Sequence, residues 1–282
     1  MRILLATDGS KHGRWATEWI GRLPLVERPQ VTALHAVDAA ALRAPFMVQP
    51  VVAGNERFIQ AEIRRMEAQA KKVLAETASL LAALGLKGKA RKVEGSVAPS
   101  ILKQAPGRKG LIVVGSRGLD AMDRFMLGSV STRVTQHAPC SVLVVKQPPR
   151  PIRRILLATD GSKSSEKALA FLLREFAPRS ATPELEVLVT HVMPFIKYPE
   201  VREAGLALAH YYADKLAKAG YRAEEICQLG HPADEIIKVA DHRKADLIVA
   251  GAKGLGAVAR FLLGSVSTKL VQHSACSVLV VR

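Results

Sequence analysis

The stretch ILLATDGSK at Ile3–Lys11 recurs without a change at Ile155–Lys163. Each copy is a short run of apolar residues that ends in an acidic turn containing glycine. A short, wholly apolar run is typical of a buried strand in a parallel sheet. Because the run and its turn recur together, we infer that the chain contains the same domain twice.

The end of each half repeats as well. Residues 111–145, LIVVGSRGLDAMDRFMLGSVSTRVTQHAPCSVLVV, align without a gap with residues 247–281, and LGSVST is identical in both. The segment QPPRPIRR at 147–154 lies between the halves; it is rich in proline and basic, and we interpret it as a short stiff linker. We therefore expect two domains, at residues 1–147 and 151–282.

The two halves differ in length. The offset between equivalent residues falls from 152 at the first repeat to 136 at the last, so the second half is 16 residues shorter. Most of the extra length of the first half falls around residues 44–58, which we interpret as a loop insertion.

Hydrophobic periodicity predicts the elements of the first half. The expected strands are residues 2–7, 30–37, 89–95, 110–116 and 140–146, and the expected helices are residues 10–23, 56–84, 99–106 and 129–138. The second half follows the same order. Strands that alternate with helices indicate an α/β fold with a parallel sheet and helices on both faces. Ligands of such folds bind at the carboxyl ends of the strands, where the turns TDGS and GSRG (GAKG in the second half) are expected.

Composition narrows the class of protein. The chain has 282 residues, of which 49% are hydrophobic, enough for two buried cores. We find no signal peptide and no apolar run of about 18 residues, so we expect no membrane insertion. Three cysteines without a CxxC motif suit reduced thiols in a cytoplasmic protein.

The charge is basic and uneven. The net charge is +16, of which residues 1–150 carry +12 and residues 151–282 carry +4. A basic chain suits anionic partners such as nucleotides, nucleic acids or anionic lipids. The basic residues are scattered, however, and 5% aromatic residues provide few surfaces for stacking bases, so a nucleic-acid target is disfavoured.

A glycine motif closes each half at identical spacing. It reads Gly115-x-x-Gly118, nine residues, then Gly128-Ser129, and its counterpart runs from Gly251 to Ser265. Glycine allows close approach of a ligand and positive φ, and successive backbone amides form an anion-binding concavity. The Gly-Ser pair opens a helix, whose N-terminus favours anions. The serine is expected either to cap this helix or to bond a phosphate oxygen, and Arg117 and Lys253 add a positive charge.

Asp8 and Asp160 stand in the other turn. A carboxylate repels phosphate, so each is expected to face ribose or base donors, to hold a metal ion, or to cap the following helix. The sequence leaves these three alternatives open.

Together, these motifs resemble the universal stress protein family, in a tandem form with two domains. ILLATDGS, the glycine motif and the closing CSVLVV carry the resemblance, which covers essentially the whole chain. It implies adenine-nucleotide-hydrolase-like (Rossmann-like) domains, each with a five-stranded parallel sheet of order 3-2-1-4-5. It also implies one ATP site per domain, with or without Mg²⁺, because members with the glycine motif bind ATP.

The resemblance assigns site residues position by position. In the first half they are Ala6, Thr7, Asp8, Ala36, Gly115, Arg117, Gly118, Gly128, Ser129 and Val130. In the second half they are Ala158, Thr159, Asp160, Val192, Gly251, Lys253, Gly254, Gly264, Ser265 and Val266. Asp120 and Asp123 of the first half align with Gly256 and Ala259 of the second. The two aspartates are expected either to recruit Mg²⁺ or to weaken phosphate binding.

The expected function is an ATP-binding regulatory protein of the stress response. The alternatives are an ATP-hydrolysing enzyme, for which we find no catalytic motif, and a basic protein that binds nucleic acid or anionic surfaces. His35 and His191 recur at strand ends and are interpreted as structural. The resemblance further implies that the strands SVLVV at 141–145 and 277–281 meet antiparallel in an internal pseudo-dimer. Homodimerisation and unidentified protein partners stay open.

Overall fold

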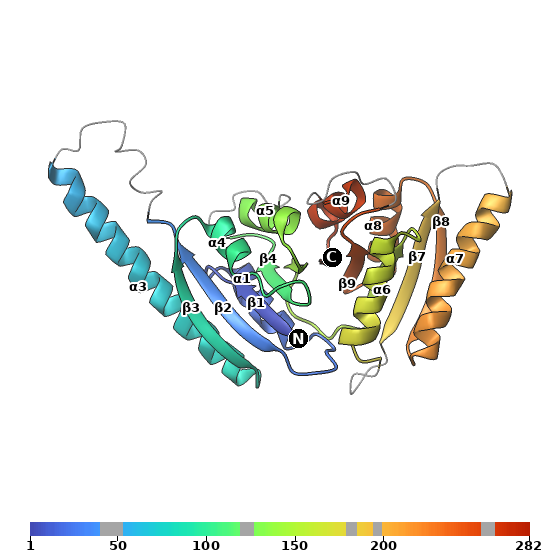
Figure 1. The fold of residues 1–282 in the computed structure, drawn as a ribbon, viewed down its shortest axis with the longest axis horizontal. Coiled ribbons are helices and arrows are strands. Elements are labelled where there is room, and N and C mark those ends of the chain that lie inside the picture. Colours follow the sequence, from blue (N-terminus) through green and yellow to red (C-terminus); the bar gives the residue numbers. More distant parts are fainter. Residues whose placement is uncertain (40–52, 119–126, 179–184, 194–198, 255–262) are drawn as a thin grey trace.

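The computed structural model describes residues 1–39, 53–118, 127–178, 185–193, 199–254 and 263–282 (Figure 1). The elements of the first half are β1 (Arg2–Ala6), α1 (Lys11–Ile20), β2 (Gln30–Val37), α3 (Ala53–Ala83), β3 (Lys87–Glu94), α4 (Val97–Lys103), β4 (Leu111–Gly115), α5 (Ser129–His137) and β5 (Ser141–Val145). Those of the second half are β6 (Arg154–Thr159), α6 (Lys163–Glu175), β7 (Glu186–Met193), α7 (Pro199–Lys218), β8 (Arg222–Leu229), α8 (Pro232–His242), β9 (Leu247–Gly251), α9 (Ser265–His273) and β10 (Ser277–Val281).

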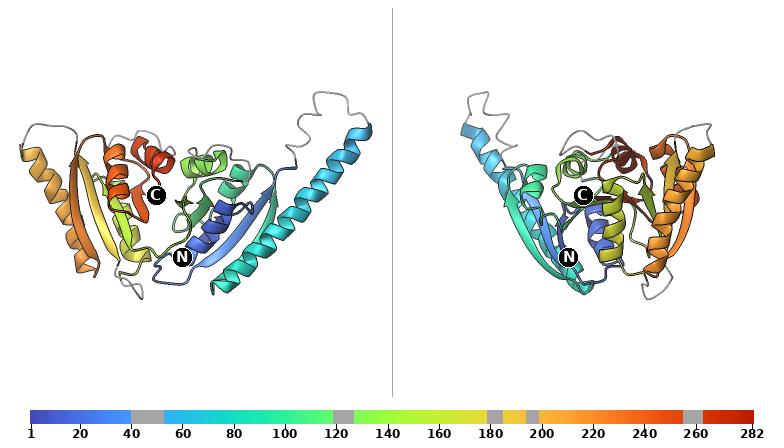
Figure 2. Two further views of the ribbon diagram at one scale, coloured as in Figure 1. Left: turned by 180° about the vertical axis from the view of Figure 1, so that it is seen from behind. Right: turned by 45° about the vertical axis from the view of Figure 1, so that its right-hand side comes forward.

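The described strands form one sheet that runs through both halves (Figures 1 and 2). Its order is β3-β2-β1-β4-β5-β10-β9-β6-β7-β8. All neighbours within a half are parallel. Each half therefore has five strands in the order 3-2-1-4-5, and the predicted α/β class and strand order are confirmed.

Alternate residues of the strands face two helix layers. Ile3, Leu5 and Leu111 belong to one buried cluster, with residues of α1, α3, α6 and α7. Leu4 and Ile112 belong to a second buried cluster, with residues of α4, α5, α8 and α9. The central strands are apolar on both sides because helices cover both faces.

The predicted loop insertion needs correction at its second part. Residues 44–52 lie outside the described residues, but residues 53–58 form the first turns of α3. α3 has 31 residues whereas its counterpart α7 has 20, so part of the extra length of the first half extends a helix.

The two halves meet along their last strands, as expected. β5 and β10 pair antiparallel, with Leu143 opposite Leu279. The loops after α1 and α6 form a second contact, in which Leu25 bridges to Phe176 in antiparallel fashion. Residues of both halves lie in one of the buried clusters, so the halves share a core.

Basic residues after the last strands reinforce this junction reciprocally. Lys146 follows β5 and donates from Nζ to the carbonyl of Ser274 at the end of α9, at 2.6 Å. Arg282 follows β10 and donates from Nη2 to the carbonyls of Thr135 and Gln136 in the last turn of α5, at 2.6 and 3.0 Å. Each half thus provides a cation for the C-terminal end of a helix in the other half, where carbonyls lack partners within the helix.

Among the described residues, every helix is too short or too polar to cross a membrane.

Candidate functional site

A cavity of about 330 Å³ opens at the carboxyl ends of β1 and β4. All ten site residues predicted for the first half line it: Ala6, Thr7, Asp8, Ala36, Gly115, Arg117, Gly118, Gly128, Ser129 and Val130. They come from segments separated by about a hundred residues, which the parallel sheet brings together at one edge. Sequence reasoning missed part of the wall, namely Gly13, Leu34, Val97, Ile101, Val114 and Ser131.

The TDGS turn shapes one wall of the cavity. Asp8 Oδ1 accepts the Ser10 N–H at 2.9 Å, and Ser10 Oγ accepts the Gly13 N–H at 3.1 Å. Ser10 is therefore the N-cap of α1, so the alternative that Asp8 caps this helix is wrong. Gly9 has a φ of +80°, which explains the glycine in this turn.

The glycines of the GxxG motif are required by close packing and not by their backbone conformation. A Cβ on Gly115 would lie 2.7 Å from the backbone of His12, so this glycine lets α1 pack against the end of β4. A Cβ on Gly118 would lie 2.7 Å from Asp8 Oδ2, so this glycine brings the two turns together. None of Gly115, Gly118 and Gly128 has a positive φ, and our expectation of positive φ in this motif is wrong.

Helix α5 points its N-terminus at the cavity. Gly128 is the N-cap, with its N–H bonded to the Ser116 carbonyl at 2.8 Å, and Ser129 is the first helical residue. The alternative that Ser129 caps the helix is therefore wrong. The N–H groups of Ser129, Val130 and Ser131 have no carbonyl to bond within the helix, so the first turn offers donors and a positive dipole end to an anion.

His35 supports the wall from β2. Its Nδ1 lies 2.9 Å from the Thr7 carbonyl, and His191 makes the same contact with Thr159 in the second half. A carbonyl only accepts, so Nδ1 carries the proton in both histidines. This contact agrees with the structural role that we inferred for the two histidines.

The GxxG turn lies close to the start of α1. Ser10 Oγ donates to the Arg117 carbonyl at 3.4 Å, which ties the two loops together. The pKa of His12 is lowered by burial and by the nearby charges of Arg117 and Lys11, against an opposing effect of Asp8.

The second half repeats these contacts. Ser162 N–H donates to Asp160 Oδ1 at 3.0 Å, and a Cβ on Gly254 would lie 2.8 Å from Asp160 Oδ2. A Cβ on Gly251 would lie 2.6 Å from the backbone of Ser164. Gly264 is the N-cap of α9, so Ser265 is its first helical residue and not its cap.

The other predicted residues of the second half take equivalent places. Ala158 and Thr159 end β6, Val192 lies in β7, Lys253 stands inside the GxxG turn, and Val266 follows Ser265 in the first turn of α9.

The two copies differ close to the cavity. His12 and Gly13 of the first half correspond to Ser164 and Ser165 of the second. Ser164 Oγ accepts the Lys253 N–H at 3.3 Å, and Ser165 Oγ lies 3.0 Å from the Tyr212 hydroxyl. The copies therefore also differ at described positions. Asp120 and Asp123, with Gly256 and Ala259, lie outside the described residues, so the effect that we expect from them stays a prediction.

The sequence profile of the universal stress protein family matches residues 1–146 and 151–282. The chain belongs to the universal stress protein family. A universal stress protein of Mycolicibacterium smegmatis is 28% identical, and the match covers 99% of this chain and 96% of that protein. A universal stress protein of Thermus aquaticus is 38% identical over 51% of this chain and 97% of its own length. The crystal structure of a universal stress protein from Archaeoglobus fulgidus superimposes with a TM-score of 0.70 at 22% identity, over 100% of this chain and 98% of that one, which shows the tandem fold.

Within the described ranges, no group of three or more His, Cys, Asp or Glu side chains is arranged to hold a metal ion. The cavity of the first domain instead offers helix N–H groups, a cation and an apolar wall.

Proposed function

We propose that this universal stress protein binds ATP at one site in each domain, 1–147 and 151–282, and acts as a nucleotide-dependent regulatory module. The observation that carries the proposal is the single cavity that gathers all ten residues predicted for the first half. Its volume of about 330 Å³ lies within the usual range of small-molecule sites.

The lining of the cavity suits both parts of a nucleotide. Val97 and Ile101 of α4 and Leu34 of β2 provide apolar surface, which suits the adenine ring. The first turn of α5 and Arg117 also line the cavity, and they suit the phosphates. Asp8 stands between the loops with Oδ1 already bonded to Ser10, so we place it at the ribose hydroxyls and away from the phosphates.

Regulation follows if bound nucleotide changes the loops that it touches. The phosphates would contact Gly118, Gly128 and the first turn of α5, which line the cavity. A partner that binds one arrangement of this surface better than another would respond to the nucleotide by differential affinity.

Titration calorimetry on protein stripped of nucleotide tests the proposal. We expect two ATP molecules per chain for the wild type. Gly128→Val should bind one ATP molecule per chain. Its side chain would enter a space where even a Cβ lies 3.3 Å from the Ser116 carbonyl and from Ser131 Oγ. Gly264→Val should do the same in the second domain, where a Cβ lies 3.3 Å from the Ala252 carbonyl.

Two results would contradict the proposal. The first is an absence of ATP binding at millimolar concentration. The second is an unchanged stoichiometry in both valine variants, which would remove the site assignment while leaving nucleotide binding elsewhere.

A further inference from the structure

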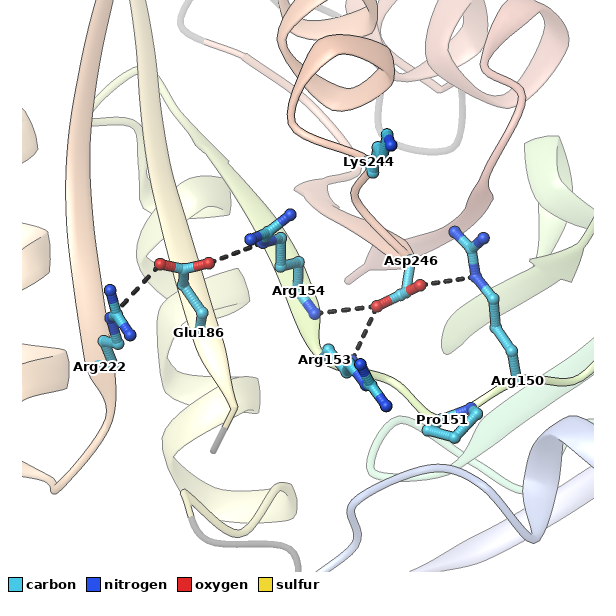
Figure 3. A pocket seen from close by; sticks show the side chains of 8 residues that line it. All are labelled: Arg150, Pro151, Arg153, Arg154, Glu186, Arg222, Lys244 and Asp246. Atoms are coloured by element: carbon cyan, nitrogen blue, oxygen red, sulfur yellow. Dashed lines mark hydrogen bonds and ion pairs between the residues drawn. The ribbon is translucent and has the colours of Figure 1, made fainter. Parts of the chain in front are cut away.

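A second cavity, of about 440 Å³, lies at the amino ends of the strands of the second half, away from the carboxyl ends that bear the proposed ATP site (Figure 3). It is lined by Arg150, Pro151, Arg153, Arg154, Glu186, Arg222, Lys244 and Asp246. Five of these residues are basic and two are acidic, so the lining carries a net charge of +3. The first three belong to the segment that joins the halves.

The two carboxylates are occupied in orienting the arginines. Asp246, 6% exposed, accepts the backbone N–H groups of Arg153 and Arg154 at 2.7 and 2.9 Å and Nε of Arg150 at 2.6 Å. Glu186 lies between Arg154 and Arg222, with Nε atoms at 2.8 and 3.5 Å (Figure 3). These contacts engage Nε, and neither terminal nitrogen of Arg222 makes a hydrogen bond with a described residue.

The cations carry more donors than the two acids satisfy. Lys244 is exposed, and neither its ammonium nor the guanidinium of Arg153 makes an ion pair with a described residue. Guanidinium groups held by carboxylates at fixed positions are well arranged to bind phosphate oxygens through paired N–H donors.

Lys244 also has an unusual backbone. Its φ is +54°, and among the described residues it is the one non-glycine residue with positive φ. It follows α8 at a place where glycine is usual, and a lysine there is strained. A lysine that lines the cavity at a position where the backbone favours glycine is consistent with a function for its charge.

The first half has a cavity of about 460 Å³ at the same end of its strands, but its lining is different: it includes Arg2, Gln30 and Arg91 and no carboxylate. Arg2, Gln30 and Lys87 occupy the strand positions of Arg154, Glu186 and Arg222, so an amide replaces one carboxylate. Gly110 stands where Asp246 does, and a Cβ there would lie 2.4 Å from Pro106. The arrangement of arginines around two carboxylates is therefore specific to the second half and the linker that precedes it.

We propose that this cavity binds a small, multiply charged phosphate compound, of the size and charge of pyrophosphate. The net charge of +3 suits an anion of about that charge, and the volume suits a small molecule better than a folded chain. Because Arg150 and Arg153 lie in the linker and Arg222 in β8, such a ligand would also tie the linker to the second half.

Calorimetry with inorganic pyrophosphate at about 0.15 M salt, without Mg²⁺, tests the proposal on the full chain. The variant Arg222→Ala with Lys244→Ala should bind about tenfold or more weakly, because it loses charge-assisted hydrogen bonds. The matched control is Lys87→Ala with Arg108→Ala, which removes two charges from the equivalent positions of the first half and should change the affinity less than about twofold. ATP binding should be unchanged in both variants, so the test is separate from that of the proposed ATP sites.

Lys244→Gly separates binding from folding. Glycine relieves the positive φ, so the unfolding midpoint in urea should be unchanged or higher while pyrophosphate affinity falls. Equal weakening by the control pair would mean diffuse surface charge and would overturn the proposal. Three other results would also overturn it. The first is that the wild type shows no saturable binding of pyrophosphate, and the second is that Lys244→Gly retains full affinity for pyrophosphate. The third is that a single-stranded oligonucleotide binds through the same residues and is not displaced by pyrophosphate.

Discussion

Glycine has two separate roles at the ends of the strands. Gly9 and Gly161 have φ values of +80° and +74°, so their turns need the conformational freedom of glycine. Gly118 and Gly254 have no positive φ, but a Cβ on either would meet an aspartate oxygen at 2.7 or 2.8 Å. The first pair therefore matters for stability and the second for the closure of the site.

Gly161→Ala isolates the conformational role. Its Cβ would meet the Leu208 methyl groups at an ordinary distance of 3.4 Å, so strain at positive φ is the main cost. We expect a loss of about 1–2 kcal/mol in the free energy of unfolding, measured in urea. Ala at Gly118, which has no positive φ, is the control, and an equal loss there would contradict this division of roles.

Gly118→Ala isolates the spatial role. Its Cβ would displace the Asp8 carboxylate, so we expect about tenfold or weaker ATP binding in the first domain while the second domain binds normally. Gly254→Ala should give the mirror result. Calorimetry resolves the two sites by stoichiometry, and full affinity at both sites in either variant would show that the aspartate does not touch the nucleotide.

At the scale of elements, the sequence predicts what repeats and misses what depends on contacts between segments far apart in the chain. The apolar strands and the opening serine of α1 are readable because their patterns are local. The role of Gly115 is not, because it comes from the backbone of His12, about a hundred residues earlier. The apolar wall from α4 is missed for the same reason, since Val97 and Ile101 look like ordinary core residues of an amphipathic helix.

The cation at the end of α5 gives a prediction for that helix. Arg282 bonds the carbonyls of Thr135 and Gln136, so Arg282→Ala should lower the free energy of unfolding by about 1–3 kcal/mol. Arg282→Lys is the matched control, because Lys146 already has this role on α9. Lysine should retain much of the stability in urea denaturation, and an alanine variant as stable as the wild type would show that the contact contributes nothing.

At the scale of the whole molecule, the junction between the halves buries the cysteine that precedes the last strand of each half. Cys140 and Cys276 directly precede β5 and β10, and they are 0% and 4% exposed. Burial raises the pKa of Cys140 to about 11 and the pKa of Cys276 to about 12, from an ordinary value of 9.0. Burial also lowers the pKa of Lys146 at the same junction to about 8, from 10.5.

These shifts predict the dependence of stability on alkaline pH. Above pH 9 the unfolded chain releases thiol protons that the folded chain keeps, so stability that is full below pH 9 is lost as the pH rises toward 11–12. The slope is about 1.4 kcal/mol per pH unit for each such thiol. Lys146 raises the free energy of unfolding with pH between pH 8 and 10.5, because in that range the unfolded chain binds a proton that the folded chain has released. In that range alone, it offsets the effect of one thiol.

Urea denaturation at pH 8.0, 9.5 and 11 measures the balance. We expect the free energy of unfolding to fall most steeply above about pH 10, where the offset from Lys146 ends. Cys140→Ala with Cys276→Ala should flatten that fall, whatever its effect at pH 8.0, because alanine does not titrate. Part of the decline should persist, since burial raises the pKa of Tyr221 to about 12 while its hydroxyl donates to the Leu172 and Phe176 carbonyls. An unchanged slope in the double variant would mean that the junction opens before the thiols ionise, and that the halves separate independently of their buried cysteines.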